Sequence, residues 1–457
     1  MSDPKPHDNH KFCSCPKAPT FMNEPQAIDV NVGAGHERGL HLRIWVMFDR
    51  QAILPLLLCA AGLFCAATQT ALAQGTPSPQ TAPPQVAPPP QPPPTPIPFE
   101  DAVLRAANDL LSKAVLPPPP AKVELVIDPL IDGASGSQSS ATRLMQERIK
   151  YVISASYPRF VVQPFSSETL ARSPLVLIGT LTAINNAGAS DGVRDAYRVC
   201  LALADLRSGS IVSKGVARAK PEAIDVTPSP AFADNPVWAN DPATNTYIKA
   251  CQGSKPGDRL DPVYVERIAT SAFVSDAILE YDDKRYREAL AYYRTALDMP
   301  GGDQLRVRSG IYLSNWKLNR RADATEAFGR LVDYSLAGNR LSVRLLFRPG
   351  TTKFLEDPEI TAPYPMWLSQ IATRAMQRDS CIDVVGHTST TGPVQVNERL
   401  SVLRAQFIKD LLQSASPALS GRLTAIGVGS KEAIVGTGRD DASDAIDRRV
   451  DFNVRRC

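Results

Sequence analysis

Three polar residues near the C-terminus have the spacing and chemistry of a ligand site. Asn397, Ser401 and Arg404 stand at positions i, i+4 and i+7. In a helix, this spacing places them on one face, within about 60° of arc. A Gly-His-Thr segment at 386–388 precedes them, and a sharp turn there would hold backbone amide donors over the start of the helix. A guanidinium, amide donors and a hydroxyl together suit a carboxylate-bearing ligand. The alternative for Arg404 is a solvated surface arginine.

The elements that must position these residues form a βαβαββ pattern over about residues 341–457. The pattern consists of strands at 342–347, 381–388, 422–429 and 448–454, with helices at 365–376 and 397–412. We expect Leu400, Leu403 and Phe407 to fill the arc beside the polar face of the second helix and to pack on the sheet.

This unit resembles the OmpA-like peptidoglycan-binding domain, whose hallmark is GHTD-x-x-G, N-x-x-LS-x-x-RA, a late G-x-G and RRV. The corresponding residues here are Gly386-His387-Thr388, Gly392, Asn397, Leu400-Ser401, Arg404-Ala405, Gly427/Gly429 and Arg448-Arg449-Val450. The resemblance covers residues 340–457, about a quarter of the chain. It implies that Arg404 grips the carboxylate of diaminopimelate in the peptidoglycan stem peptide. The ligand-binding residues that it implies are Arg404, Asn397, Thr388, Ser389, Ser401 and Arg449.

The sequence departs from the family pattern at one position that bears on binding. The family's Asp, which pairs with the ligand's ammonium, is Ser389 here. A hydroxyl accepts a hydrogen bond but cannot neutralise an ammonium. Losing one side of a buried charge pair costs about 2–5 kcal/mol, which is on the order of 30- to 5000-fold in affinity. Binding would then be weakened, redirected or lost, unless a nearby acid substitutes. The candidate substitutes are Asp383, Asp440, Asp441 and Asp444.

Composition argues against an enzyme and against a protein that coats nucleic acid. Lys and Arg total 50 against 47 Asp and Glu, a net charge of +3, which is too balanced for coating nucleic acid or an anionic membrane. Of the 5 histidines, only His387 lies beyond residue 41. A His-rich zinc site is therefore nearly excluded, and a Ser-His-Asp hydrolase would depend on His387 alone. No nucleophile motif accompanies it, so we interpret His387 as a fold position of the turn and expect no cofactor or metal.

The N-terminal part has the layout of an exported protein. An apolar run at 52–67 follows Arg43 and Arg50 and precedes an Ala-Leu-Ala cleavage signal at 71–73, so residues 47–73 are interpreted as a signal peptide. Residues 1–46 are then an extension from a start codon assigned too far upstream. The alternatives are an uncleaved anchor and, through Cys59 or Cys65, a lipoprotein. Residues 74–98 are rich in Pro and uncharged, which predicts a polyproline II linker of roughly 75 Å.

Four cysteines remain after cleavage, and an even number in an exported chain indicates two disulfides. Four cysteines allow three pairings, and free buried thiols are the alternative. If the 381–388 and 448–454 strands run antiparallel, Cys381 and Cys457 share the sheet end opposite the ligand residues. We therefore predict a Cys381–Cys457 disulfide, which leaves Cys200 with Cys251.

Residues 99–224 predict a small α/β sandwich. The elements are a helix at 99–114, a strand at 122–132, a helix at 141–155, strands at 159–165 and 174–184, and a hairpin at 197–219 that turns at Ser208-Gly209. Their order resembles the periplasmic domains of the flagellar protein FlgO and of the lipoprotein activators of penicillin-binding proteins. The Gly- and Ser-rich loop at 133–140 lacks the Gly-Lys-Ser/Thr ending of a P-loop, so we interpret it as a loop that ends in a helix N-cap.

Residues 261–337 predict helices with an internal repeat, joined to the α/β unit by a connecting segment at 225–260. Ala289 and Ala324 are 35 apart, as are Tyr293 and Phe328. A small residue followed by an aromatic one at this period is typical of tetratricopeptide repeats. Two copies are too few to stand alone, so we expect them to pack on a neighbouring domain. An ordinary helical connector is the alternative.

Together these patterns predict a multidomain α+β protein without enzymatic activity: an α/β sandwich, a two-repeat helical unit and an OmpA-like domain. We expect an envelope scaffold in the Gram-negative periplasm, associated with the cell wall or outer membrane. One end would bind peptidoglycan and another would recruit a protein partner through the helical repeats or the α/β domain. The alternative is a protein-interaction adaptor whose OmpA-like domain has lost wall binding because of Ser389.

Overall fold

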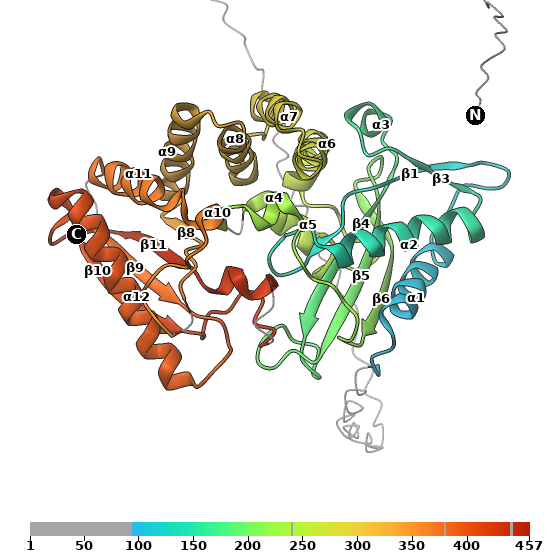
Figure 1. Cartoon of the computed structure of the whole chain (residues 1–457). Helices are drawn as coiled ribbons and strands as arrows, with labels where there is room; N and C mark the ends of the chain where they lie inside the picture. Colours follow the sequence, from blue (N-terminus) through green and yellow to red (C-terminus); the bar gives the residue numbers. More distant parts are fainter. Residues whose placement is uncertain (1–93, 239–240, 349, 379–380, 439–441) are drawn as a thin grey trace, which may run out of the picture. The chain divides into compact units, whose positions relative to one another are not determined.

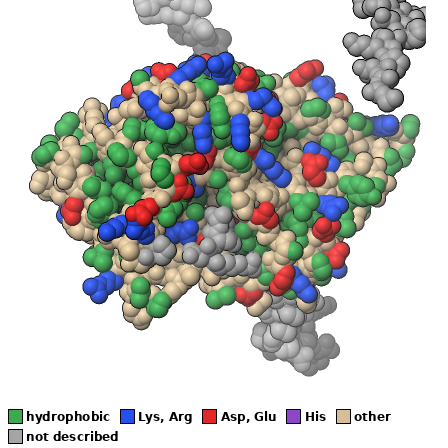
Figure 2. Space-filling model, viewed as in Figure 1, with side chains coloured by type: hydrophobic (Ala, Val, Ile, Leu, Met, Phe, Trp, Pro, Cys, Tyr) green, Lys and Arg blue, Asp and Glu red, His purple; other side chains and the backbone are tan. Residues whose placement is uncertain are grey.

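The computed structural model describes residues 94–457, except 239–240, 349, 379–380 and 439–441 (Figure 1). The expected extension, the signal peptide and nearly all of the Pro-rich linker lie outside these residues. Within the part of the chain that is described, no helix combines the length and apolar character that a membrane span requires. Basic and acidic side chains are interspersed on the face drawn in Figure 2.

The first sheet is mixed, with strand order β3-β1-β4-β5-β6 and β2 beside β4. Its strands are β1 (Val123–Ile127), β2 (Ile131–Asp132), β3 (Phe160–Gln163), β4 (Leu175–Ile184), β5 (Ala196–Asp205) and β6 (Ser210–Ala219). β1 is parallel to both β3 and β4, whereas β4, β5 and β6 are antiparallel. The predicted hairpin is confirmed, and Gly209 occupies its turn with φ of 64°, a conformation that favours glycine.

Helices cover both faces of this sheet. α1 (Phe99–Ser112) and α2 (Ser140–Ser156) pack on one face, and α3 (Ser167–Ala171), α5 (Pro242–Gln252) and α6 (Pro262–Asp282) lie on the other. Alternate side chains of β4 pack on opposite faces of the sheet: Leu177 packs into the α1–α2 core, and Val176 packs into the α5–α6 core. Ser139 caps α2 by accepting a hydrogen bond from Thr142 N, so the interpretation of the 133–140 loop is confirmed. The expected connecting segment supplies α5, which completes the second layer.

The helical segment continues from α6 through α7 (Tyr286–Asp298), α8 (Leu305–Lys317) and α9 (Arg321–Ala337). The recurring residues occupy equivalent places on α7 and α9. Ala289 and Ala324 are fully buried, as is Phe328, and Tyr293 is 3% exposed. Tyr293 lies directly against Gly310 of α8, where a side chain would not fit. The spacing therefore marks helix contacts, while the assignment to tetratricopeptide repeats stays a prediction.

The second sheet has strand order β10-β9-β11-β8-β7. Its elements are β7 (Val237–Trp238), β8 (Arg340–Val343), β9 (Cys381–His387), β10 (Leu423–Gly429) and β11 (Val450–Arg455), with α11 (Tyr364–Met376) and α12 (Val394–Ala415). Short helices lie at α4 (Pro230–Ala233) and α10 (Pro358–Thr361), with 3-10 turns at Pro417–Leu419 and Ala442–Asp447. β8 ends before the predicted 342–347 strand does, because Leu346 and Phe347 instead pair with the returning loop at Phe354 and Leu355.

The helix α12 faces the sheet with a different side from the one we expected. Asn397, Ser401 and Arg404 are 7%, 0% and 5% exposed, whereas Leu403 is 46% exposed. The expectation that Leu403 packs on the sheet is therefore wrong, whereas Phe407 is half-buried and packs against the core beside Phe347 and Phe354. The reason is that β9 and β10 carry Gly386 and Gly427 under the helix, where an added Cβ would collide with the backbone of Ser401 and Val402. The helix backbone lies on these glycines, so its small residues face the strands.

The cysteines form the two predicted pairs. Cys381, at the start of β9, lies 4.9 Å from Cys457 between Cα atoms, and Cys200 of β5 lies 6.0 Å from Cys251 of α5. Both separations are in the range of protein disulfides. β9 and β11 run antiparallel, as the prediction of the first pair assumed.

Candidate ligand site of the C-terminal unit

The turn after β9 is held by the motif asparagine. Asn397 Nδ2 donates to the carbonyls of Ser389, at 3.3 Å, and Thr391, at 3.0 Å. Thr388 N donates to Gly429 O at 2.9 Å, which joins the turn to the end of β10. The side chain of Asn397 is thus engaged within the protein, and its role is to shape the turn.

The motif serine has a comparable architectural role. Ser401 Oγ donates to Glu398 O at 2.7 Å and accepts from Gly429 N at 2.9 Å. Because Ser401 is fully buried, it ties α12 to the end of β10 and does not face a ligand. The hydroxyl of Thr388 differs: it is buried and has no hydrogen-bond partner among the described residues.

Arg404 reaches from α12 to the loop that follows β8. Its Nε donates to Thr351 O at 3.1 Å and its Nη2 to Arg348 O at 3.3 Å, and the guanidinium lies 4.7 Å from the ring centre of Phe347. No carboxylate pairs with it among the residues that the structure describes. Burial, together with the smaller effect of the nearby Arg448, lowers the pKa of Arg404 to about 10. Carbonyl oxygens therefore solvate the Arg404 cation, and no carboxylate of the described residues neutralises it.

Arg449 is neutralised inside the protein. Its Nε donates to Asp451 Oδ1 at 3.1 Å, and the other oxygen of Asp451 lies 3.2 Å from His387 Nε2 and is paired with Arg340. Burial alone would raise the pKa of Asp451, but His387, Arg449 and Arg340 outweigh it and hold that pKa well below its usual range. This network was not expected from the sequence, although Asp451 stands two residues after Arg449 in the predicted 448–454 strand, a spacing that places both side chains on one face.

The acids proposed as substitutes for the missing Asp are engaged elsewhere or lie outside the described residues. Asp383 pairs with Arg455 at 2.7 Å. It stands four residues before His387, the last residue of β9, and so lies away from the turn. Asp444 is fully buried and accepts from Thr437 N and Oγ1 at 3.1 and 2.9 Å. Asp440 and Asp441 lie outside the described residues.

The predicted residues therefore separate into groups. Thr388, Ser389 and Asn397 meet at the turn, and Ser401 joins them through Gly429. Arg404 makes its hydrogen bonds with the 348–351 loop instead, and Arg449 belongs to the Asp451 network. Among the described residues, no group of His, Cys, Asp and Glu could hold a metal ion. The chemistry that the arrangement supports is recognition of an anion by a buried guanidinium.

No protein-family model matches this chain, and no curated protein matches it. Solved structures match about a quarter of it. The periplasmic domain of Helicobacter pylori MotB is 19% identical, covering 25% of this chain and 73% of that one with a TM-score of 0.21. The cell wall anchor of the T6SS from Pseudomonas aeruginosa is 26% identical, covering 26% and 81% with a TM-score of 0.22. The peptidoglycan-associated lipoprotein from Burkholderia pseudomallei is 22% identical, covering 26% and 93% with a TM-score of 0.22.

Proposed function

We propose that this protein is a non-enzymatic scaffold of the cell envelope that binds peptidoglycan non-covalently through residues 340–457. The ligand would be the carboxylate of diaminopimelate in the stem peptide, and Arg404 would be its cationic partner. Thr388 and Ser389 would add hydrogen bonds from the turn that Asn397 and Ser401 hold in shape.

The observation that carries the proposal is the unneutralised charge of Arg404. A buried cation loses its hydration at a cost of several kcal/mol, and carbonyl hydrogen bonds recover only part of that. Arg404 is 5% exposed and pairs with no carboxylate among the described residues. A ligand carboxylate would supply the missing charge, and a guanidinium can hold it with two parallel hydrogen bonds. The sequence motif supports the same ligand.

The remaining parts of the proposal concern location and partner. Residues 47–73 would export the chain, and the Pro-rich linker would separate its anchor or cut end from the folded part. Paired helices α6–α7 and α8–α9, which we assign to tetratricopeptide-like repeats, would bind a protein partner together with the α/β unit. The recurring helix contacts at Ala289 and Ala324 support the repeat assignment on which this part of the proposal rests.

The test is co-sedimentation of the purified chain from Gln74 onward with isolated sacculi. Arg404→Met keeps most of the side-chain volume and removes the charge, and we expect it to abolish sedimentation. Arg399 is exposed on the same helix, so Arg399→Met is the matched control and should sediment like the wild type. Circular dichroism of both variants verifies that the fold is retained. Sedimentation of Arg404→Met at the wild-type level would refute the proposed site.

A second candidate is favoured by Ser389, which lacks the charge that the family uses for the ligand's ammonium. In this case the domain is a protein-interaction adaptor that has lost wall binding. Ser389→Asp decides between the two: restoring the carboxylate should tighten wall binding by at least about tenfold, given about 2–5 kcal/mol for a buried charge pair. Wild-type chain that never sediments, at any salt concentration, would support the adaptor.

A further inference from the structure

The carboxyl end of β1 lies where the strand order of the first sheet reverses. From β1 the chain passes through α2, on one face, to β3, and then through α3, on the other face, to β4 on the opposite side of β1. In open α/β sheets, ligands bind in the crevice outside the carboxyl ends of the strands at such a reversal. In this protein a cavity lies there, lined by Asp128, which directly follows β1, and by residues of the β1–α2 loop, α5, α6 and α8.

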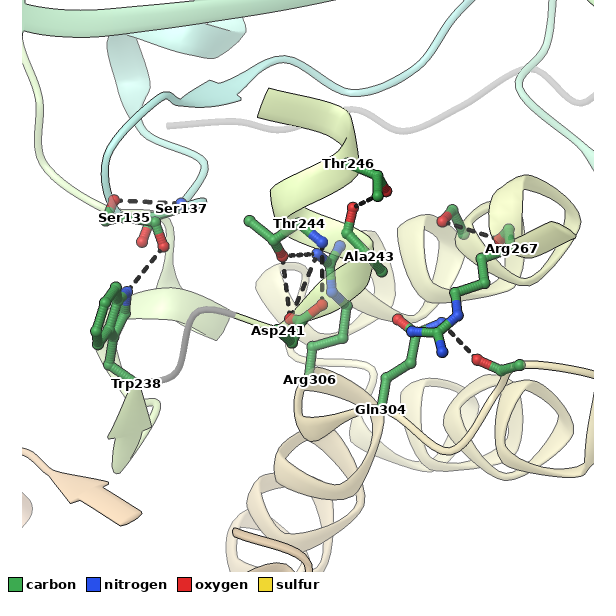
Figure 3. Close-up of polar contacts among 12 residues, drawn as sticks. Ser135, Ser137, Trp238, Asp241, Ala243, Thr244, Thr246, Arg267, Gln304 and Arg306 are labelled. Carbon is green, nitrogen blue, oxygen red and sulfur yellow. Dashed lines mark hydrogen bonds and ion pairs between the residues drawn. The ribbon is translucent and has the colours of Figure 1, made fainter. Parts of the chain in front are cut away.

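Two arginines line this cavity. Arg306 of α8 contacts Thr244 Oγ1 and lies 3.8 Å from Asp241 Oδ2, at the N-terminus of α5. Arg267 of α6 has a buried Nε without a hydrogen-bond partner among the described residues. Figure 3 shows Arg306 reaching to the start of α5 and Arg267 reaching toward Gln304. These side chains bring two positive charges to the cavity.

The acidic groups around the cavity do not balance these charges. Asp241 caps α5 by accepting from Thr244 N at 3.0 Å, so its charge is shared between Arg306 and the helix N-terminus. Asp128 accepts a hydrogen bond from Tyr264 OH at 2.8 Å. Burial raises the pKa of Asp128 to about 7, so near neutral pH this carboxyl is only partly charged. The lining therefore favours an anion.

A side-chain amide adds a polar group to the lining of the same cavity. Gln138 is 8% exposed and lines the same cavity. Its backbone carbonyl accepts from Ser229 N at 2.9 Å, but its side chain has no hydrogen-bond partner among the described residues. This amide is therefore available for a hydrogen bond with a ligand in the cavity.

We propose that this cavity binds a small organic anion through a carboxylate or phosphate group. Arg267 and Arg306 would pair with the anion, and the Gln138 amide would donate a hydrogen bond to it. The cavity is built from residues that take no part in the proposed wall site, so the two proposals stand or fall separately.

The experiment is titration calorimetry of the purified chain with inorganic phosphate and with succinate, in chloride buffer at constant ionic strength. Gln138→Glu hardly changes the size of the side chain but turns an amide donor into an anion. We expect it to weaken binding by at least about tenfold, the effect of losing one charge-assisted hydrogen bond. Arg267→Gln should also weaken binding, and it replaces Gln138→Glu as the test variant if that variant does not fold. Arg287→Gln, at an exposed position of α7, is the matched control and should bind like the wild type.

The two probes separate the chemical sources of the anion. Binding of phosphate alone would identify a phosphorylated ligand, and binding of succinate alone would identify a carboxylate. Absence of binding with both probes would overturn the proposal. So would equal affinities of the wild type, Gln138→Glu and Arg267→Gln.

Discussion

At the scale of single residues, the motif looks like one binding face, but its members have different roles. Some of them hold the fold, and one carries a charge that a ligand could pair with. Asn397 and Ser401 use their side chains to hold the turn and the end of β10. Arg449 has an internal acid, Asp451. Arg404 is the motif residue whose charge is left without a described carboxylate, so the proposed binding of an anion depends on it.

Asp128 should make stability depend on pH. Its pKa in the folded chain is about 7, against 3.8 without burial, so between these values the unfolded chain releases a proton that the folded chain retains. Folding stability contributed by this group is therefore present below pH 3.8 and is lost as pH rises toward 7. At 1.36 kcal/mol per unit, the loss between pH 4.5 and 7.5 is roughly 3 kcal/mol.

Urea unfolding of the wild type and of Asp128→Asn at these two pH values measures this loss. Asn does not titrate, and its carbonyl can still accept from Tyr264. We expect the variant to gain about 3 kcal/mol relative to the wild type on going from pH 4.5 to 7.5. A constant difference between the two proteins would show that Asp128 keeps an ordinary pKa.

At the scale of elements, periodicity located the strands and helices but not the orientation of α12. The leucine stripe at Leu400 and Leu403 has the spacing of a core face, yet small and polar residues face the sheet. Gly386 and Gly427 cause this, because strands without side chains at these positions let the helix backbone approach closely. A sequence shows which residues share a helix face, but the partner surface determines which face is buried.

Gly386→Ala should destabilise the C-terminal sheet. The new Cβ would collide with Ser401 O, and α12 would have to move away from β9. We expect a loss of about 1–3 kcal/mol or more in the free energy of unfolding, as for overpacked cores. Gly338→Ala is the control: Gly338 has φ of −79° and a Cβ there would meet Ser335 O at an ordinary 3.4 Å. Equal stability of both variants would contradict the close packing of α12.

At the scale of the whole described part, the expected units share elements and cores. The segment 225–260 contributes α5 to the first sheet and β7 to the second. Trp238, on β7, donates to Ser135 O of the β2–α2 loop at 3.1 Å. Phe328 of α9 stacks on Trp367 of α11, with ring centres 5.6 Å apart. Residues 340–457 therefore lack packing partners when they are separated from the rest of the chain.

The cysteine pairs should stabilise this arrangement in an oxidising compartment. They span 51 and 76 residues, and loops of this length correspond to about 4 kcal/mol each in the chain-entropy model. For the chain from Gln74 onward, purified from the periplasm, we expect no free thiols under denaturing, non-reducing conditions. Reduction should lower the urea midpoint. Four reactive thiols would contradict both pairs.

The sequence alone determined the features that depend on local pattern and fixed spacing. The strand pattern located β4 and the β5–β6 hairpin. The expectation that two strands with cysteines at their ends run antiparallel predicted the Cys381–Cys457 pair, which left Cys200 with Cys251. The motif singled out Arg404. Only the tertiary structure decided what each side chain contacts: α5 and β7 in a segment expected to be a connector, the inward face of α12, the Asp451 network and the cavity at the end of β1. These features arise from contacts between residues far apart in the chain, and such contacts leave no local periodicity for the sequence to reveal.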